Sequence, residues 1–168
     1  MSSTAGRNRY EYPNGVLRNK FGITDGTQLA QVEASYTLFR IAELANQPIA
    51  EPFDLARLQT IHRYLFQDVY DWAGEIRQVE ISKGNSQFAY VAYILSNAQK
   101  LFAQLAQEHD LRGLPDDQFA RHAAYYLGEI NVLHPFREGN GRTQRVFFND
   151  LRGRLGISWI GASFPHNR

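Results

Sequence analysis

The sequence predicts an all-α protein, a bundle of helices that carries one small β-hairpin. Five stretches have apolar residues at intervals of three and four, which is the period of an α-helix with one buried face. Only one stretch alternates apolar and polar residues, as a strand does. With 168 residues, 43% of them hydrophobic, the chain can bury one core, and we expect residues 1–168 to form a single domain.

Residues 1–25 are predicted to form an extended lead-in segment. They are mostly polar, and Pro13, Gly15 and Gly22 interrupt any regular structure. One short helix is expected within this segment, around residues 16–21. The regular helices begin after it.

The first long helix is predicted over residues 27–46, TQLAQVEASYTLFRIAELAN, with Thr24 or Asp25 as its N-terminal cap. Pro48 ends it, because proline cannot continue a helical hydrogen-bond ladder. The residues expected to face the core are Leu29, Val32, Tyr36, Phe39 and Leu44.

A second helix is predicted over residues 54–67, where Asp54 can act as the cap. Its helical spacing places a set of apolar residues on one face, and we expect that face to be buried. The set is Leu55, Leu58, Ile61 and Leu65.

Residues 76–90, IRQVEISKGNSQFAY, break the helical pattern. Val79 and Ile81 alternate with polar neighbours, and the sequence then turns at Lys83, Gly84 and Asn85. This pattern predicts a β-hairpin, and a surface loop without function is the alternative.

Two further helices are predicted over residues 90–110 and 117–133, the latter capped by Asp116 or Asp117, and a last one begins after Gly141. Their expected core residues are Ile94, Leu95, Ala98, Leu101, Phe102 and Leu105; Phe119, Ala123, Tyr126, Leu127 and Ile130; and Val146, Phe147 and Leu151. The last two helices are therefore joined by a short loop.

The loop is the first part of residues 134–145, HPFREGNGRTQR, a segment rich in charged residues and glycines. Gly139, Asn140 and Gly141 stand where a helix begins, and the first backbone N–H groups of a helix have no acceptor within it. Such groups, together with the positive end of the helix dipole, bind phosphate. The glycines let the backbone approach an anion closely.

The neighbouring side chains complete a site for a magnesium nucleotide. Arg142 and Arg145 are three positions apart on one helix face and offer forked donors to phosphate oxygens. Glu138 supplies a carboxylate for Mg²⁺ beside those phosphates, and His134 is suited to accept a proton near neutral pH. Each feature alone is common at turns and helix ends, so the prediction depends on their combination.

The positions His134, Phe136, Glu138, Gly139, Asn140, Gly141, Arg142 and Arg145 match the pattern HxFx(D/E)GNGRxxR at every specified place. The chain therefore resembles the Fic family. Upstream, IHRYLFQDVYDWAGEIR, residues 61–77, is similar to the family's helix and Trp-Ala-Gly turn. The resemblance covers roughly residues 12–159. It implies a helical fold and an enzyme that transfers AMP from ATP to a Ser, Thr or Tyr hydroxyl of a protein.

The resemblance also implies a role for each residue of the motif. His134 would be the base, and Phe136 would point into the core and fix the loop. Glu138 would hold Mg²⁺ between the α- and β-phosphates. Gly139, Asn140 and Gly141 would form the anion hole, with Asn140 at the α-phosphate, while Arg142 and Arg145 would meet the β- and γ-phosphates.

In Fic enzymes the hairpin acts as a flap that aligns a strand of the target protein by β-strand addition. In this chain the corresponding residues would be Val79, Glu80, Ile81, Ser82 and Lys83. Lys83 and Phe88 would be the side chains that touch the target.

Two departures from the family bear on regulation and completeness. Many Fic proteins carry an inhibitory helix with the pattern (S/T)xxxE(G/N), and no Ser or Thr of this chain is followed four positions later by Glu. The restraint is therefore expected from a separate small antitoxin that carries this helix, and an unrestrained enzyme is the alternative. After GISWIGASFPHNR the family usually continues with further helices, which we expect to be missing here.

The target and the chemistry have alternatives. The similarity to short antitoxin-paired Fic toxins suggests bacterial type II topoisomerases, DNA gyrase and topoisomerase IV, as targets, whereas secreted Fic effectors modify host small GTPases. Transfer of another phosphate-containing group is a further alternative. A catalytically silent nucleotide-binding or protein-binding module is the alternative from another class, and a basic helical DNA-binding protein is a third.

Composition narrows the partners and the location. The formal net charge is +1, which gives no reason to expect nucleic acid as a partner, and no apolar run is long enough to span a membrane. The chain has no cysteine, so a cytoplasmic protein is expected, or one delivered into another cell. His62 and the other histidines lack metal-ligand spacing and are expected to pack or to lie at the surface.

Overall fold

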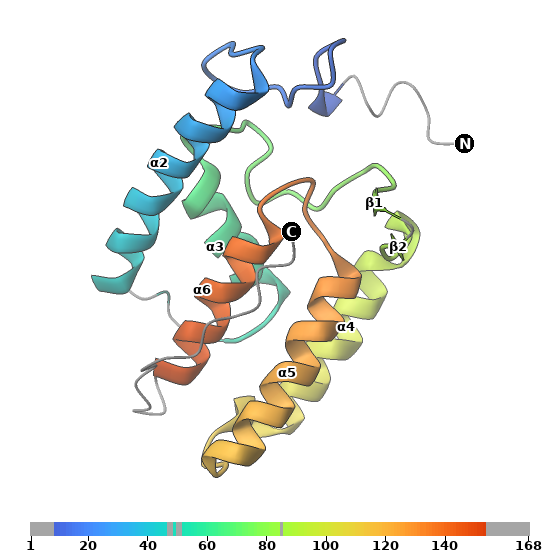
Figure 1. Ribbon diagram of the computed structural model, residues 1–168. Coiled ribbons are helices and arrows are strands. Elements are labelled where there is room, and N and C mark those ends of the chain that lie inside the picture. The colour runs from blue at the N-terminus through green and yellow to red at the C-terminus, as the bar shows by residue number, and fades with distance from the viewer. Residues whose placement is uncertain (1–8, 47–48, 50–51, 85, 154–168) are drawn as a thin grey trace.

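The computed structural model describes residues 9–46, 49, 52–84 and 86–153, and these residues form a mostly helical protein, which confirms the predicted fold class (Figure 1). The elements are α2 (Gly26–Asn46), α3 (Leu55–Phe66), β1 (Ser82–Lys83), β2 (Ser86–Gln87), α4 (Val91–Gln107), the 3-10 helix η1 (His109–Leu111), α5 (Asp116–Leu133) and α6 (Asn140–Gly153). No helix in this described part of the chain is both long and apolar enough to cross a membrane.

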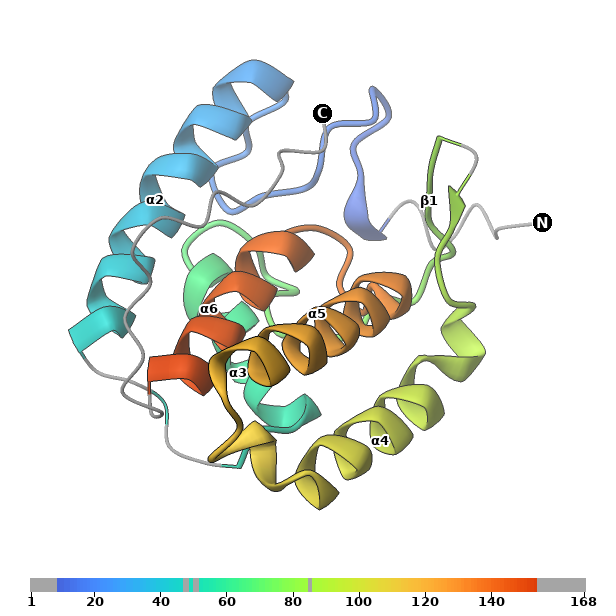
Figure 2. The ribbon, with the colours of Figure 1, turned by 60° about the horizontal axis from the view of Figure 1, so that its bottom comes forward.

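Helices α3 and α6 form the centre of the molecule. Each packs against the other, α3 also contacts α2, and α5 contacts both α4 and α6. Figure 2 shows α3 and α6 in the middle, with α2 on one side and α4 on the other. The core lies where these helices meet, and its fully buried side chains include Leu58, Ile61, Leu65, Ile94, Tyr126 and Phe147.

Helix α2 begins as predicted, and Leu29 and Leu44 are buried as predicted, but the rest of its buried face differs. The Asp25 carboxylate accepts a hydrogen bond from the Gln28 N–H at 2.7 Å, so Asp25 is the cap. The predicted burial of Tyr36 and Phe39 is wrong, because these side chains are 39% and 58% exposed. The buried face is Leu29, Glu33, Thr37 and Leu44. Its two polar members find partners inside the protein, and that pairing allows them to be buried.

The cap of α3 is also as predicted, since Asp54 accepts a hydrogen bond from the Arg57 N–H at 2.8 Å. Helix α5 differs: Pro115 holds the cap position without a side-chain hydrogen bond, and Asp116 and Asp117 lie in the first turn. There the two carboxylates still favour the helix, because they lie near the positive end of its dipole.

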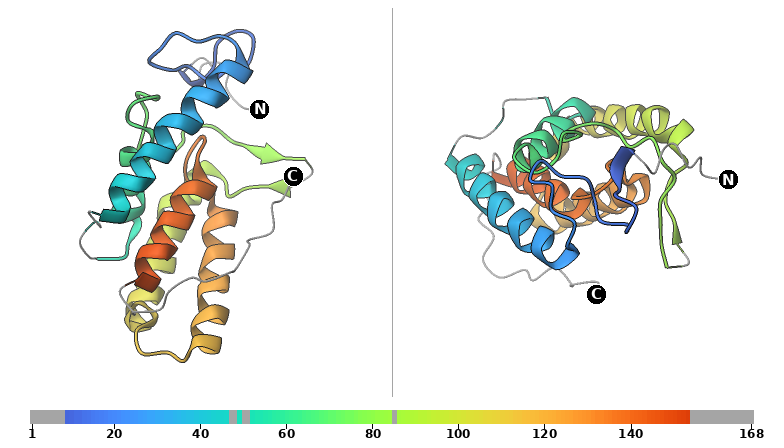
Figure 3. Two further views of the ribbon diagram at one scale, coloured as in Figure 1. Left: turned by 60° about the vertical axis from the view of Figure 1, so that its left-hand side comes forward. Right: turned by 90° about the horizontal axis from the view of Figure 1, so that it is seen from above.

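The predicted hairpin is present but short. Ser82 pairs with Gln87 and Lys83 with Ser86 in an antiparallel ladder, while residues 79–81 lie before the first strand. Figure 3 shows this hairpin projecting from the helical body beside the loop between α5 and α6.

The helix expected around residues 16–21 is absent, and the prediction is wrong there. Instead, Glu11 and Leu17 form an isolated antiparallel bridge, and Asn19 uses its side chain to bond the Ile23 N–H at 3.0 Å and two backbone carbonyls. A local side-chain network therefore replaces the helical ladder. Pro48, Asn85 and residues 154–168 fall outside the described part, so the predictions that concern them stay predictions.

Candidate active site

The predicted motif loop lies between α5 and α6 and borders a cavity of about 710 Å³. The cavity brings together residues from the motif and from the hairpin, which are far apart in the sequence. From the motif these are His134, Glu138, Gly139, Asn140 and Gly141, and from the hairpin region Val79, Glu80, Ile81, Ser82, Lys83 and Phe88. The remaining lining residues are Tyr10, Glu11, Asn131 and Arg137.

His134 ends α5 in a left-handed backbone conformation, with φ 45° and ψ 62°. Its Nδ1 lies 3.2 Å from the Asn131 carbonyl oxygen. A carbonyl only accepts, so Nδ1 carries the proton and donates. The other ring nitrogen, Nε2, therefore has a lone pair, and it has no hydrogen-bond partner among the residues that the structure describes. His134 is thus in the tautomer that a base facing the cavity requires.

The His134 ring is half-buried and stacks on the Phe88 ring of the hairpin, with centroids 3.8 Å apart and planes 19° apart. Burial lowers the pKa of His134 to about 4, and the charges of Arg77 and Lys83 act in the same direction. The imidazole is consequently neutral at physiological pH and able to accept a proton.

Arg77 connects the loop to both ends of the hairpin. Its guanidinium is fully buried and donates to the carbonyls of His134 at 2.7 Å, of Val79 at 2.8 Å and of Ala89. Its backbone N–H donates to the Pro135 carbonyl at 2.8 Å. A buried cation is stable when such acceptors surround it, so Arg77 fixes the position of the His134 backbone relative to the hairpin.

Inside the loop, Asn140 closes a tight ring with Phe136. The Asn140 Oδ1 accepts from the Phe136 N–H at 2.9 Å, and the Asn140 Nδ2 donates to the Phe136 carbonyl at 2.8 Å. Both residues are buried, Phe136 to 1% exposure. Phe136 thus points into the core as predicted. The Asn140 side chain shapes the loop, and its contact with an α-phosphate stays a prediction.

His62 supports the loop from behind. Its Nδ1 accepts the Gly74 N–H at 2.8 Å, so Nε2 must carry the proton and donate to the Glu138 carbonyl at 2.9 Å. The ring stacks on Phe136 at 3.9 Å, and burial lowers its pKa to about 4. The expectation that His62 packs is confirmed, and its place is directly behind the motif.

The backbone N–H groups in the first turn of α6 have no acceptor within the helix and can bind an anion. Gly139 precedes the helix with φ +79°, and its carbonyl accepts from the Thr143 N–H at 3.1 Å. The N–H groups of Asn140, Gly141 and Arg142 come before the first possible intrahelical acceptor. Gly139 cannot be replaced without displacement, because an added Cβ would lie 2.2 Å from the Phe66 ring. This arrangement suits a phosphate.

Glu138 lies at the edge of these donors with its side chain 43% exposed. One of its oxygens, Oε1, accepts the Gly139 N–H at 2.9 Å, which leaves the other oxygen available. No three acidic, histidine or cysteine side chains gather into a metal site within the described ranges. A single carboxylate beside bound phosphates is a common setting for Mg²⁺, whose other ligands are then phosphate oxygens and water, so Glu138 fits that ion.

The two arginines of the motif have different surroundings. Arg142 turns toward α2, where it pairs with Glu33 and Thr37, whereas Arg145 is exposed and has no ion pair or hydrogen bond within the described residues. Neither lines the cavity. Their contacts with the β- and γ-phosphates stay predictions.

Comparison with known proteins identifies the family. The model of the Fic/DOC family matches residues 52–151. The chain belongs to the Fic/DOC family. It is 47% identical over 147 residues to the protein adenylyltransferase VbhT of Bartonella schoenbuchensis, a match that covers 86% of this chain and 31% of that protein. It is 42% identical to the probable protein adenylyltransferase Fic of Salmonella typhimurium, over 93% of this chain and 78% of that protein.

Solved structures of Fic domains agree with the fold. The N-terminal Fic domain of Bep8, a translocated effector of Bartonella sp. 1-1C, has a TM-score of 0.84 at 32% identity and covers 89% of this chain and 76% of its own. The effector BepC of Bartonella tribocorum, solved with bound AMPPNP, has a TM-score of 0.81 at 28% identity over 89% and 79% of the two chains. The chain thus spans about three quarters of these structures but about a third of VbhT.

Several residues of this Fic site were not predicted from the sequence. Glu11 of the lead-in segment pairs with Arg137 of the loop, and Tyr10 and Asn131 also line the cavity. Arg77 and Glu33 have no motif signal in a single sequence. Arg77 could have been noticed at the end of the Trp-Ala-Gly stretch, and Glu33 by its helical spacing from Leu29 and Thr37.

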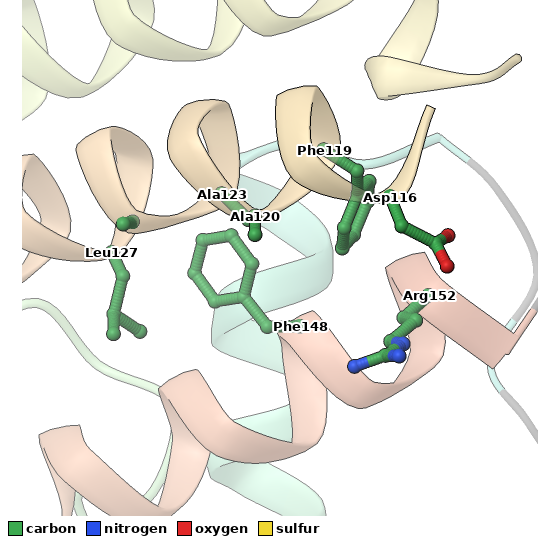
Figure 4. Close-up of a pocket in the computed structure, with 8 residues that line it drawn as sticks. Asp116, Phe119, Ala120, Ala123, Leu127, Phe148 and Arg152 are labelled. Atoms are coloured by element: carbon green, nitrogen blue, oxygen red, sulfur yellow. The ribbon is translucent and has the colours of Figure 1, made fainter. Parts of the chain in front are cut away.

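A second cavity, of about 180 Å³, lies between α5 and α6 at the opposite end of the Fic domain from the loop. Figure 4 shows Phe119, Ala123 and Leu127 of α5 facing Phe148 of α6, with Arg152 and Asp116 at one end. It is apolar and contains none of the motif residues, so it plays no part in the site described above.

Proposed function

We propose that the chain transfers AMP from ATP to a hydroxyl group of a target protein. The enzyme class, protein adenylyltransferase, is that of the curated relatives, which are 40–47% identical over most of this chain. The bound AMPPNP of BepC is an ATP analogue and supports ATP as the co-substrate. The finer steps below are our proposal for this chain.

The observation that carries the proposal is the state of His134. Its protonated Nδ1 is bonded to the Asn131 carbonyl, so Nε2 is the basic atom, and it belongs to the same cavity as the donors at the start of α6. A base next to a phosphate site is the arrangement that activates a hydroxyl for attack on phosphorus.

In the proposed step, the target's hydroxyl oxygen forms a bond to the α-phosphorus of ATP. The bond from that phosphorus to the oxygen bridging the α- and β-phosphates breaks, and pyrophosphate leaves. The hydroxyl proton passes to Nε2 of His134. The backbone N–H groups of Asn140 and Gly141 stabilise the charge that develops on the α-phosphate oxygens, and Arg142 and Arg145 bind the β- and γ-phosphates.

Within this proposal Glu138 holds Mg²⁺, which when bound neutralises phosphate charge and orients the leaving group. Glu138 is suited to this because it keeps one carboxylate oxygen without a partner among the described residues. Removal of Mg²⁺ with a chelator would then stop transfer.

The target is proposed to dock along the hairpin. Residues 79–83 border the cavity, and a target strand paired with β1 would bring its hydroxyl side chain toward His134. Bacterial type II topoisomerases remain the proposed targets and host small GTPases the alternative, with a separate small antitoxin as the proposed regulator.

The test uses ATP labelled at the α-phosphate or, separately, at the γ-phosphate, incubated with the protein in bacterial lysate. We expect a protein band labelled from the α-phosphate alone, and loss of that label in His134→Ala, by about 10²–10⁴-fold in rate. Label from the γ-phosphate would mean phosphoryl transfer instead. Transfer that persists unchanged in His134→Ala would reject the assigned base, and absence of label with intact ATP binding would favour a silent nucleotide-binding module.

A further inference from the structure

The Arg142 side chain leaves the first turn of α6 and lies against α2. Its Nη2 donates to the Glu33 carboxylate and its Nη1 to the Thr37 hydroxyl at 3.3 Å. The guanidinium also sits over the Phe66 ring, 4.8 Å from the centroid. These contacts come from two other helices. Within the motif, the Glu138 carboxylate also lies 3.6 Å from the Arg142 Nη2. The orientation of Arg142 is therefore set largely by groups outside the motif, together with one carboxylate inside it.

Glu33 is a buried carboxylate, and the residue is only 8% exposed. Its second oxygen accepts a hydrogen bond from the Tyr70 hydroxyl. Burial, together with the charge of Glu33, raises the pKa of Tyr70 well above its ordinary value, so Tyr70 remains a protonated donor. Both carboxylate oxygens are thus occupied, one by a cation and one by a hydroxyl.

Such a carboxylate is costly to bury unless its charge is paired. The partner of Glu33 is Arg142, a residue of the family motif. An apolar side chain at this core position of α2 would need no such partner. Thr37, which is 2% exposed, adds a second contact to Arg142 and itself donates to the Glu33 carbonyl at 2.8 Å. The polar pair on the buried face of α2 therefore serves Arg142.

The pairing leaves Arg142 able to bind a ligand. A guanidinium has five N–H donors, and the hydrogen bonds to Glu33 and Thr37 use two of them. The side chain is 23% exposed. Neither Glu33 nor Arg142 lines the site cavity, but the Glu33 side chain is only 11% exposed, so Arg142 is the more accessible member of the pair.

We propose that Glu33 is a positioning residue, which holds Arg142 in the orientation that binds the β-phosphate of the nucleotide. The proposal rests on the function proposed above, in which Arg142 meets that phosphate. It assigns to α2, outside the family motif, a part in nucleotide binding that a single sequence does not reveal.

The test compares nucleotides with and without a β-phosphate, in the full chain with Mg²⁺ present. The dissociation constants of ADP and AMP are measured by calorimetry for the wild type and for Glu33→Gln, which keeps the size of the side chain and removes its charge. We expect ADP to bind about tenfold more weakly in Glu33→Gln, while AMP changes by less than about twofold. Thr37→Val, which removes only the second contact, should weaken ADP by about threefold.

The matched control is Asp68→Asn. Asp68 pairs with Arg40 of α2 at 2.7 and 2.9 Å, so this variant also removes an ion pair of α2, but one without contact to Arg142. Both affinities should be unchanged in it. A thermal melt of each variant shows that the protein is folded.

Three results would overturn the proposal. Equal weakening of ADP and AMP would give Glu33 a general structural role, an unchanged ADP affinity would remove any role, and tighter ADP binding would mean that Glu33 competes with the nucleotide for Arg142. The assay needs no transfer reaction. The α-phosphate labelling can therefore fail while Glu33→Gln still weakens ADP binding more than AMP binding. That combination would reject the proposed function and keep the role of Glu33 in nucleotide binding.

Discussion

The motif loop and the hairpin border the same cavity, but they are held very differently. The loop is fixed by buried groups from several elements: His62, Arg77 and Asn140 each bond its backbone directly. The hairpin has two strands of two residues, with Ser82, Lys83, Gly84 and Gln87 exposed, and it is anchored at its base. The chemical groups of the loop are therefore preorganised, whereas the hairpin, which is the proposed docking surface, is held mainly at its base.

If the loop depends on its buried supports, Gly139→Ala should have the largest effect. The alanine would have to adopt φ +79° and would place its Cβ 2.2 Å from the Phe66 ring. We expect a loss of roughly 3–5 kcal/mol in the free energy of unfolding and at least about a hundredfold loss of transfer. Gly113→Ala is the control, because its φ is +74° and nothing lies within 4 Å. Similar losses in both variants would contradict the role of the close contact.

The second support to remove is His62. In His62→Asn the amide oxygen can still accept the Gly74 N–H, but the bond to the Glu138 carbonyl and the stack on Phe136 are lost. We expect roughly 2–4 kcal/mol of destabilisation in denaturant titration and about tenfold slower transfer. His122→Asn, at a half-exposed histidine about three turns of α5 before the loop, removes only a surface pair with Glu108, so it should leave transfer unchanged and cost less than about 1 kcal/mol. If the His62→Asn variant were as stable as the wild type and transferred AMP at the same rate, the loop would not depend on His62 for its conformation.

Substitutions in the hairpin should have smaller effects, and these effects should appear only in the KM for the target protein. Phe88→Ala removes the ring that stacks on His134 at 3.8 Å, and we expect about a fivefold rise in KM for the target protein. Lys83→Ala, at an exposed strand position, should cost about twofold. The KM for ATP should not change in either variant. A rise in the KM for ATP would mean that the hairpin supports the nucleotide site as well.

The smallest effect is expected from pH. Because burial lowers the pKa of His134 from 6.5 to about 4, the base is already deprotonated near neutral pH. Transfer should therefore stay constant between about pH 6 and 8 and halve only near the lowered pKa. A transfer rate that falls by half near pH 6.5 would show that His134 has the pKa of an ordinary solvent-exposed histidine.

The same measurement requires a stability control. His62 has a folded pKa of about 4 and an unfolded value of 6.5, so its unfolded form binds a proton first as the solution is acidified. Its contribution to stability is complete above 6.5 and is lost as the pH falls through about 4. Thermal melts at each pH separate this unfolding from the titration of the base.

The helices and the motif could be predicted from the sequence because both depend on local spacing. Asp25 and Asp54 act as caps as expected, and the loop falls between α5 and α6. The buried face of α2 could not be predicted from hydrophobicity, since Glu33 is buried only because Arg142 and Tyr70, distant in sequence, pair with it. The helix expected at residues 16–21 is absent for a local reason, because the Asn19 side chain bonds the neighbouring backbone in place of a helical ladder.

The position of Arg77 has a consequence for how such a protein can change its target. One guanidinium holds the carbonyls of Val79 and Ala89, and with them the two ends of the hairpin, next to the carbonyl of His134. Apart from Phe88, whose ring stacks on His134, the segment between those ends can then vary in length and sequence while Arg77 keeps its base beside the histidine. In the proposed function, target recognition can change through this segment while the bonds that hold His134 stay in place.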